Sequence, residues 1–497
     1  MIKKILITNR GEIAVRIIRA CKELGITSAV IYSDADKHSL HTHLADESFY
    51  IGEAPASASY LNKEKIIDLA KKINADAIHP GYGFFSENSD FIKAVEGAGI
   101  IFIGPSSESV KMMGNKTEAR SLMQKNKVPI VPGTTKSLMN VNEGKNISKE
   151  IGYPVLLKAS AGGGGKGMRK VSSEKEFEDA FDAAKREALK AFGNEDVYLE
   201  KYIESPRHIE VQLIADKHGN YVHLFERECS IQRRHQKIIE EAPSSFVDSA
   251  TREKITTAAI NTAKACNYYN AGTIEFLMDK KKNFYFLEMN TRLQVEHPVT
   301  EMITGIDLVK EQISIAEGNK LSFNQNELKI NGHAIESRIY AEDPENNFLP
   351  SAGKIIEYIE PSGPGVRVDG GFISGSEISL YYDPLIAKVI CYGKDRNTAI
   401  KKMERALEEY HIAGLVTNIY FLSGIFKQKD FLEGQFDINY IEREYLKKQK
   451  DQKEISSTEM IAALFSAILK KESVSNGKVL TSEIQTTMNK WLEQTDE

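Results

Sequence analysis

The sequence lacks several features that define other classes of protein. Only four cysteines occur among 497 residues, and no two of them form a C-x-x-C pair. They are Cys21, Cys229, Cys266 and Cys391. We therefore expect neither a disulfide framework nor a zinc site, and a reducing, cytoplasmic compartment fits best. No apolar run approaches the length of a transmembrane helix, and charges interrupt the first apolar run, MIKKILITNRGE, where a signal peptide needs a longer apolar core.

An excess of one charge is also missing. The chain has 65 Lys and Arg against 70 Asp and Glu, with a net charge of -5 and a pI near 6.2. This balance does not indicate nucleic acid or an anionic membrane as a partner. The hydrophobic share of 41% and the charged share of 27% are typical of a soluble globular protein. The length predicts about two to four domains.

Short apolar runs alternate with helical patterns over residues 1–113. Strands are predicted at KKILITN, SAVIYS, DAIHPGYG and GIIFIGP, and an amphipathic helix, EIAVRIIRACKELG, is predicted to end at Gly25. This alternation is typical of βαβ units and predicts a Rossmann-like parallel sheet. The first strand-to-helix turn holds a single glycine, Gly11, so the fingerprint G-x-G-x-x-G is missing there. A nicotinamide-dependent dehydrogenase is therefore disfavoured.

Predicted strands dominate residues 114–330, and a third block with its own strands follows over residues 331–446. The strands of the second block are YPVLLKAS, MRKVSS, VYLEKYI, HIEVQLIAD and GNYVHLFERE, followed by a hairpin made of GTIEFLMD and NFYFLEMN. The pattern NTAIKKMERALEEY predicts the final helix of the third block.

The character of the chain changes after residue 446. The stretch YLKKQKDQKE is charged and typical of a linker. Beyond it, Ser456 and Glu459 fit a capping box. Apolar residues then recur at helical spacing, at Ile461, Leu464, Phe465 and Ile468. We expect residues 447–497 to form a linker and a helical tail, which either docks a partner subunit or packs on the chain's own surface.

A run of glycines lies between two predicted strands. Gly162 to Gly165 are followed by Lys166 and Gly167, so the Ser or Thr that a P-loop needs is missing. A strand rather than a helix follows, so a dinucleotide loop does not fit either. Backbone N–H groups without side chains can close over phosphates, and Lys158 on the preceding strand could add a positive charge. We expect a mobile flap over phosphates, with a surface hairpin as the alternative.

The predicted hairpin places two carboxylates opposite each other. With its loop at residues 280–283, Glu275 faces Glu288 and Leu277 faces Phe286. Two buried like charges at this range repel each other unless a cation lies between them, and Mg²⁺ prefers such oxygens. A surface hairpin with scattered charges is the alternative.

Strand alternation adds two further groups to the face of Glu288. Asn290 offers a neutral oxygen ligand, and Arg292 offers a charge able to hold a small anion in a bidentate manner. By the same spacing, Gln294 and Glu296 follow Arg292, so a base and an anion holder would face one small substrate.

Two other clusters leave alternatives open. The stretch ERECSIQRRHQKIIEE collects Arg227, Arg233, Arg234, His235 and Lys237, as either a solvated charged face or a loop beside an anion site. In HIEVQ, three polar residues alternate and share one strand face: His208, Glu210 and Gln212. A single histidine in such a place is more often structural than a ligand.

Several blocks over residues 1–446 resemble the biotin carboxylase family of the ATP-grasp superfamily. They are NRGEIAVRIIRACKELG, HPGYGFFSEN, MGNKTEAR, KASAGGGGKGMR, EKYIESPRHIEVQ, ECSIQRRHQKIIEEAPS, GTIEFL, EMNTRLQVEHPVTE and HAIESRIYAEDP. The resemblance implies a multidomain α/β and α+β fold. Its parts are an N-terminal Rossmann-like domain (1–113), an ATP-grasp domain (114–330) with a mobile lid (about 131–203), a C-terminal biotin carboxylase domain (331–446) and the tail (447–497).

The resemblance also implies roles for individual residues. ATP would be bound by Lys116, Lys158, Gly163, Gly164, Gly165, Lys166, Gly167, Glu200, Lys201, Ile203, His208, Gln232 and His235. Mg²⁺ or Mn²⁺ would be bound by Glu275, Glu288 and Asn290. Bicarbonate and biotin would be bound by Lys237, Arg292, Gln294, Val295, Arg338 and Tyr82. The catalytic residues would be Arg292, Lys237, Glu296 and Arg338, with Glu296 deprotonating bicarbonate and Arg338 stabilising the biotin enolate.

The activity that the resemblance implies is ATP- and bicarbonate-dependent carboxylation of biotin through carboxyphosphate, within an acetyl-, propionyl- or other acyl-CoA carboxylase. The biotin-bearing Ala-Met-Lys-Met motif does not occur, and the length leaves no room for a carboxyltransferase domain. We therefore expect biotin on a separate carrier protein, a carboxyltransferase subunit as a further partner, and a homodimer or larger oligomer. Subunits that serve propionyl- or methylcrotonyl-CoA are more similar than the typical bacterial acetyl-CoA enzyme to two blocks of this chain, RIYAEDPENNFLPSAGKI and YYDPLIAKVICYGKDR.

Two alternatives remain at this point. One is another ATP-grasp ligase that activates bicarbonate for ammonia or an aminoimidazole. The other is a non-catalytic nucleotide-binding subunit. Intact Lys116, Lys237, Glu275, Glu288 and Arg292 argue against the second, because an inactive relative is free to lose them.

Overall fold

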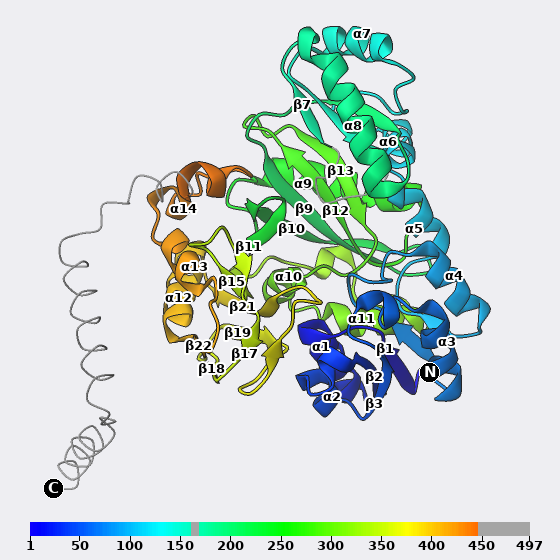
Figure 1. Ribbon diagram of the computed structural model, residues 1–497, viewed down its shortest axis with the longest axis vertical. Coiled ribbons are helices and arrows are strands. Elements are labelled where there is room, and N and C mark those ends of the chain that lie inside the picture. The colour runs from blue at the N-terminus through cyan, green and yellow to red at the C-terminus, as the bar shows by residue number, and fades with distance from the viewer. Residues whose placement is uncertain (161–167, 446–497) are drawn as a thin grey trace, which may run out of the picture. The chain divides into compact units, whose positions relative to one another are not determined.

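The computed structural model describes residues 1–160 and 168–445 (Figure 1). One compact unit spans Met1–Tyr440, and the described start of a second unit is the π-helical turn Ile441–Tyr445. The predicted glycine flap and the predicted tail lie outside the described residues. Within those residues, no helix is both long and apolar enough to cross a membrane.

A parallel sheet forms the N-terminal domain, as predicted. Its order is β3-β2-β1-β4-β5, with bounds Glu47–Gly52, Thr27–Ser33, Lys4–Ile7, Ala77–His79 and Ile101–Phe102. The accompanying helices are α1 (Gly11–Leu24), α2 (Leu40–Leu44), α3 (Lys63–Lys72) and α4 (Ser89–Gly97). Gly25 ends α1 with a left-handed φ of 70°, which a glycine adopts without a steric cost. The inner strands β1, β2 and β4 are mostly buried because both faces of the sheet are covered there, whereas the edge strand β3 begins with alternating half-buried and exposed residues.

Two helices lead into a small antiparallel sheet that we call the lid. The helices are α5 (Ser107–Gly114) and α6 (Lys116–Lys125). The lid strands lie in the order β7-β6-β8, at Arg169–Val171, Val155–Ala159 and Val197–Lys201, and are packed by α7 (Val141–Ile151) and α8 (Phe177–Phe192). Val155, Leu157 and Phe177 are fully buried in the separate core of the lid. Figure 1 shows the lid at the top of the unit.

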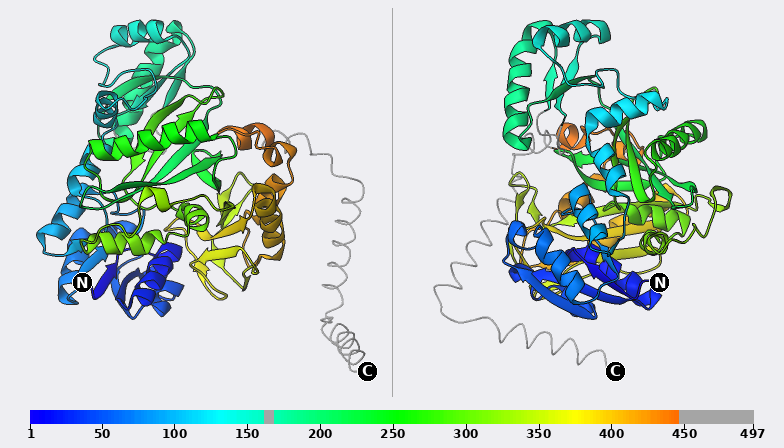
Figure 2. Two further views of the ribbon diagram at one scale, coloured as in Figure 1. Left: turned by 180° about the vertical axis from the view of Figure 1, so that it is seen from behind. Right: turned by 90° about the vertical axis from the view of Figure 1, so that its right-hand side faces the viewer.

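An eight-stranded antiparallel sheet is the centre of the unit. Its order is β13-β12-β9-β10-β11-β14-β21-β19, at Phe284–Asn290, Asn270–Met278, Arg207–Ala215, Tyr221–Arg233, Gln236–Ala242, His333–Tyr340, Leu385–Gly393 and Val366–Gly370. The helices α9 (Ser249–Ala265), α10 (His297–Thr304) and α11 (Leu308–Ala316) pack on it, and Figure 2 shows α9 lying across one face.

This central sheet crosses the predicted domain boundary at residue 330. Strand β11 pairs with β14, and Glu240 lies opposite Glu336. The second and third predicted blocks therefore share one sheet, and the boundary between them stays a prediction.

The third block adds small sheets and three helices. The sheets pair β15 with β16, β17 with β20 and β18 with β22, at Glu342–Asp343 with Leu349–Pro350, Gly353–Lys354 with Glu377–Ile378, and Glu357–Ile359 with His411–Ala413. Helix α12 spans Arg396–Glu409, as predicted. The prediction that it is the final helix was wrong, because α13 (Ile419–Phe426) and α14 (Lys429–Leu432) follow it. Both are too short to show a clear helical periodicity in the sequence.

The predicted register of the β12–β13 hairpin is correct in one half of the hairpin and shifted in the other. Glu275 lies opposite Glu288, as predicted. The pairing of Leu277 with Phe286 was wrong, because Phe276 lies opposite Phe286 and Leu277 opposite Tyr285. A β-bulge in β13 inserts one residue between the two halves, and such an irregularity leaves no mark in the alternation of residue types.

Candidate functional site

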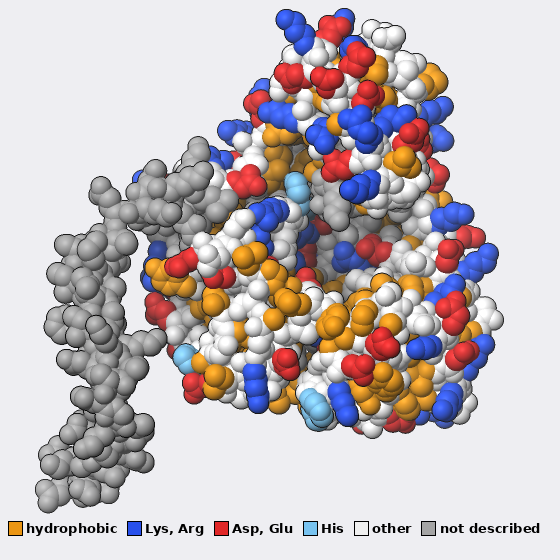
Figure 3. All heavy atoms as spheres, in the orientation of Figure 1, with side chains coloured by type: hydrophobic (Ala, Val, Ile, Leu, Met, Phe, Trp, Pro, Cys, Tyr) orange, Lys and Arg blue, Asp and Glu red, His pale blue; other side chains and the backbone are white. Residues whose placement is uncertain are grey.

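A cavity of about 620 Å³ lies between the lid and the central sheet. Figure 3 shows a hollow in this face, with positively and negatively charged side chains inside it. The predicted site residues that line it are Lys116, Lys158, Glu200, Lys201, Ile203, His208, Gln232, His235, Lys237, Glu275, Glu288, Asn290, Arg292, Gln294, Val295, Glu296 and Arg338. Residues more than 200 positions apart in the chain thus meet at one cavity.

Two lysines face the cavity from its lid side. The Lys158 Nζ of β6 lies 2.9 Å from Glu200 Oε2 on β8, and Arg120 also binds Glu200. Burial alone would lower the pKa of Lys158, but the carboxylate of Glu200 raises it. Lys116, the first residue of α6, lies 3.8 Å from Glu288, and burial lowers its pKa. These two ammonium groups suit the oxygens of a polyphosphate.

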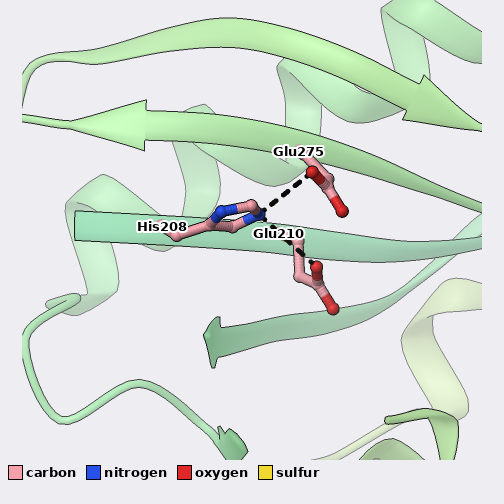
Figure 4. A group of neighbouring side chains, drawn as sticks. All are labelled: His208, Glu210 and Glu275. Atoms are coloured by element: carbon pink, nitrogen blue, oxygen red, sulfur yellow. Dashed lines mark ion pairs between the residues drawn. The ribbon is translucent and has the colours of Figure 1, made fainter. Parts of the chain in front are cut away.

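The carboxylate of Glu275 is buried on the opposite side of the cavity. Its Oε1 accepts hydrogen bonds of 2.8 Å from Lys237, Asn290 and Gln294. Its Oε2 lies 3.1 Å from His208 Nε2. Figure 4 shows His208 and Glu210 on one strand and Glu275 on the next, all directed toward one another. His208 is therefore a partner of Glu275 at the cavity wall rather than an isolated core histidine.

The oxygen-rich side chains of the hairpin fit a divalent cation. Glu275 and Glu288 lie opposite each other on β12 and β13, and Asn290 ends β13. The Glu288 side chain is 38% exposed and lines the cavity, so a ligand in the cavity can reach it. Two carboxylates and an amide oxygen form a donor set that suits Mg²⁺.

Lys237 lies at the centre of a buried cluster of charges. Its Nζ donates hydrogen bonds to Glu210 at 2.5 Å, to Glu275 at 2.8 Å and to Glu296 at 2.6 Å. Burial alone would lower the pKa of Lys237, but these three carboxylates raise it well above its usual value. Lys237 therefore stays charged, with its three hydrogen bonds directed to carboxylates.

Glu296 connects Lys237 with Arg338. Glu296 Oε2 lies 3.0 Å from Arg338 Nη2, and Arg338 Nε donates to Glu240 at 2.6 Å. Burial alone would raise the pKa of Glu296, but Lys237, Arg338 and Arg227 lower it well below its usual value. The carboxylate is therefore ionised and able to accept a proton.

The strand-spacing argument for Arg292, Gln294 and Glu296 was wrong. Strand β13 ends at Asn290, and Glu296 is the residue that precedes helix α10. The side chains nevertheless converge, because tertiary contacts hold each of them. Gln294 and Glu296 are held by Glu275 and Lys237, and Arg292 binds Asn290 at 3.0 Å and Glu87 at 2.8 Å.

The basic stretch ERECSIQRRHQKIIEE is neither a loop nor a solvated face. It forms the β10–β11 hairpin, whose tight turn is Arg234 and His235 with φ of 49° and 68°. Arg227 is completely buried and binds Glu210 at 2.6 Å and Gln294 at 2.7 Å. Both open alternatives missed the hairpin, although Arg234, His235 and Lys237 of this stretch do line the cavity.

Some site residues lie elsewhere or were missed. Among the described residues, Tyr82 does not line the cavity, and its hydroxyl donates to Glu12. The flap residues Gly163, Gly164, Gly165, Lys166 and Gly167 lie outside the described residues. Sequence reasoning did not consider Glu87. It placed Glu210 on the face of His208 and Arg227 in the basic cluster, but assigned neither of them an individual role.

Comparisons with known proteins agree with this architecture. Residues 1–110 match the family model "Biotin carboxylase, N-terminal domain", residues 115–324 match "Carbamoyl-phosphate synthase L chain, ATP binding domain", and residues 336–443 match "Biotin carboxylase C-terminal domain". The three matches thus follow one another along the chain.

Individual relatives cover most of the chain. Biotin carboxylase 1 of Bacillus subtilis is 52% identical over 443 residues, which are 89% of this chain and 98% of that protein. The mitochondrial propionyl-CoA carboxylase alpha chain of Sus scrofa is 51% identical over 89% of this chain, but this covers only 61% of that longer protein. The chain therefore belongs to the biotin carboxylase family.

Solved structures give the same assignment. The Campylobacter jejuni biotin carboxylase complex with β-γ-ATP has a TM-score of 0.87 at 49% identity, covering 89% of this chain and 99% of that one. The biotin carboxylase domain dimer of Hydrogenobacter thermophilus 2-oxoglutarate carboxylase, in complex with MgADP, ADP and bicarbonate, has a TM-score of 0.86 at 51% identity, covering 89% and 97%.

Proposed function

We propose that this chain is the biotin carboxylase component of an acyl-CoA carboxylase. It uses ATP to activate bicarbonate and transfers the carboxyl group to biotin carried on another protein. The observation that carries the proposal is the buried series Lys237–Glu296–Arg338 in the same cavity as the opposed carboxylates Glu275 and Glu288. An anion holder, a base, an enolate stabiliser and a cation site therefore surround one volume.

ATP occupies the part of the cavity next to the lid. Lys116 and Lys158, which line this part of the cavity, bind its phosphates. The adenine side is formed by Glu200, Lys201, Ile203, His208, Gln232 and His235, which line the cavity. Glu275, Glu288 and Asn290 would hold Mg²⁺, and the ion would neutralise charge on the phosphate oxygens.

Bicarbonate binds beside Lys237, Arg292, Gln294 and Val295. An anion that takes over the charge of Lys237 weakens the hydrogen bond of Lys237 to Glu296, so the pKa of Glu296 rises toward the range of a useful base. Glu296 then accepts the proton of bicarbonate, whose oxygen attacks the γ-phosphorus of ATP. ADP leaves with the electrons of the broken P–O bond, and carboxyphosphate forms.

Carboxyphosphate then breaks into carbon dioxide and phosphate. The phosphate takes the proton from N1 of biotin, and the resulting enolate-like anion attacks carbon dioxide. Arg338 reaches the cavity from β14, so its guanidinium can stabilise this anion from the side opposite the lid. Exclusion of water by the lid protects the reactive intermediate.

The partners follow from this chemistry. Biotin arrives on a biotin carboxyl carrier protein, a carboxyltransferase subunit accepts the carboxyl group, and the chain itself forms a homodimer or larger oligomer. The four described cysteines are free thiols, which supports a reducing, cytoplasmic compartment. Identity does not select the acyl-CoA, because a biotin carboxylase and a propionyl-CoA carboxylase chain are 52% and 51% identical to this chain.

The proposal is tested with the purified chain, ATP, Mg²⁺ and bicarbonate. We expect slow bicarbonate-dependent ATP cleavage that free biotin accelerates, with carboxybiotin as the product. Glu296→Ala is the negative control. Cleavage accelerated by ammonia or an aminoimidazole instead of biotin would identify a different bicarbonate-activating ligase. Nucleotide binding without any cleavage would identify a non-catalytic subunit.

A further inference from the structure

A buried lysine lies directly behind one wall of the cavity. Lys388 of β21 has no exposed surface, and its Nζ donates a hydrogen bond of 2.9 Å to the carbonyl oxygen of Val295. Lys388 is not among the described residues that line the cavity, whereas Val295 and the next residue, Glu296, are. The lysine therefore touches the backbone of the site without reaching the space that a substrate occupies.

The charge of Lys388 is held in place by carboxylates from two other elements. Its Nζ lies 3.2 Å from Glu12 of α1 and 3.9 Å from Asp369 of β19. Burial alone would lower the pKa of Lys388, but Glu12, Glu336 and Asp369 raise it. A buried ammonium is costly unless it is paired, so these contacts keep it charged and fix where it points.

The ammonium group of Lys388 connects the N-terminal domain with the central sheet. Glu12 also accepts a hydrogen bond from the hydroxyl of Tyr82. A continuous series of contacts thus leads from Tyr82 in the N-terminal domain through Glu12 and Lys388 to the carbonyl of Val295.

The segment held by Lys388 lies between two regular elements. Arg292 to Glu296 lie between the end of β13 at Asn290 and the start of α10 at His297, so no strand or helix fixes their backbone. Yet four of these five residues line the cavity. A displacement of about 1 Å in a group that positions a reactant can cost about 10²-fold in rate.

We propose that Lys388 is a positioning residue for the bicarbonate-activating step, anchored by Glu12. By holding the Val295 carbonyl, it fixes the turn that presents Arg292, Gln294 and Glu296 to the anion. The inference rests on the function proposed above. The lysines assigned to ATP, Lys158 and Lys116, lie on β6 and α6. Lys388 binds the backbone of the turn and neither of these two elements. Loss of Lys388 should therefore affect bicarbonate far more than ATP.

The test compares Lys388→Met with Lys402→Met. Lys402 of α12 donates a hydrogen bond of 2.8 Å to the carbonyl of Tyr392. Tyr392 lies on β21, as Lys388 does, but it does not line the cavity. Both variants lose one lysine–carbonyl bond. We expect Lys388→Met to raise the KM for bicarbonate at least about tenfold and to lower kcat, with the KM for ATP within about twofold of the unmodified chain. Lys402→Met should leave all three values near those of the unmodified chain.

Two further variants keep the proposal falsifiable if Lys388→Met does not fold. Glu12→Gln retains the lysine but removes its nearest counter-charge, and should shift the bicarbonate KM in the same direction by a smaller factor. Lys388→Arg retains a donor and a charge, and should restore part of the bicarbonate affinity. ATP binding measured by calorimetry should stay unchanged in every folded variant.

The outcomes separate this inference from the function on which it rests. If the unmodified chain shows no bicarbonate-dependent ATP cleavage, the proposed function fails. If the unmodified chain is active but the bicarbonate KM is unchanged in Glu12→Gln and in folded Lys388→Met, only the positioning role of Lys388 is overturned. Equal losses of ATP and bicarbonate affinity would also overturn it, since they indicate a general structural defect.

Discussion

Single side chains at the cavity differ in which substrate they can reach. Lys237 binds three carboxylates, and Glu296 lies between Lys237 at 2.6 Å and Arg338 at 3.0 Å. Arg338 is held from behind by Glu240 at 2.6 Å. These contacts support the proposal that Glu296 acts on bicarbonate and that Arg338 acts later, on biotin.

We expect the two half-reactions to separate in mutants of these residues. Arg338→Gln should slow biotin carboxylation strongly but keep much of the bicarbonate-dependent ATP cleavage seen without biotin, because Lys237 still pairs with Glu296. Glu296→Ala should lose both, by about 10²–10⁴-fold for a general base. ATP cleavage is followed with bicarbonate, with and without free biotin. Equal loss of the biotin-independent cleavage in both mutants would contradict this division of roles.

At the scale of elements, the β12–β13 hairpin brings the proposed magnesium ligands together. The bulge after Glu275 shifts the apolar half of the hairpin by one residue, yet Glu275 and Glu288 remain opposite each other. The pairing of the two carboxylates is thus a property of the register rather than of either strand alone.

Removing either carboxylate should weaken metal binding. We expect Glu275→Gln and Glu288→Gln to lower ATP cleavage at ordinary magnesium by at least about 10- to 100-fold, the cost typical of losing even an outer partner of a metal site. The measurement is a magnesium titration of ATP cleavage. Partial recovery of Glu288→Gln at high magnesium would agree with a lost ligand, while normal cleavage in both variants would exclude the site.

Strand β11 also carries a carboxylate that joins three elements. Glu241 Oε2 lies 2.9 Å from His333 Nε2 of β14 and 2.7 Å from Arg396 Nε of α12. Burial alone would raise the pKa of Glu241, but Arg396 and His333 lower it from 4.5 to about 2. The stabilisation from these contacts is therefore fully present above pH 4.5 and is lost as the pH falls toward about 2.

Glu241→Gln should destabilise the protein by about 3 kcal/mol at pH 7, since one pKa unit corresponds to about 1.4 kcal/mol. The difference from the unmodified chain should shrink as the pH is lowered below about 4.5. Urea unfolding at pH 7 and pH 4 measures it. Glu357→Gln is the matched control, because Glu357 pairs with His411 at 3.0 Å on the exposed surface, where such pairs contribute little. A pH-independent loss in Glu241→Gln would contradict the assignment.

At the scale of the whole molecule, the central sheet makes one unit of the two predicted domains after residue 113. Strands β11 and β14 lie on opposite sides of the predicted boundary at residue 330 and pair with each other. The salt bridge between Arg338 and Glu240 also joins the two sides of this boundary. Cutting the chain there would expose two long strand edges and leave a buried arginine without its partner.

We therefore expect residues 1–330 and 331–445, expressed separately, to be insoluble or unfolded, and co-expression to restore bicarbonate-dependent ATP cleavage. Circular dichroism and thermal unfolding of each fragment measure this, with the intact chain as the control. A cooperative thermal transition of the 331–445 fragment alone would contradict the expectation.

The sequence by itself determined the class of fold and many of the residues that line the cavity. Alternating apolar runs predicted the parallel sheet, since each βα unit shows its periodicity locally. The pairing of Glu275 with Glu288 followed from one hairpin, and family resemblance supplied Lys116, Lys237 and Arg338. These features depend on residues close in the chain or on distinctive short blocks.

Only the tertiary structure decided the rest, because contacts between distant residues leave no local pattern. The bulge in β13 and the turn from Arg292 to Glu296 are set by the surrounding packing. The same holds for Lys388, which lies 93 positions from the Val295 carbonyl it binds. In the sequence Lys388 is one lysine in an apolar strand, and only folding brings its charge beneath the proposed base.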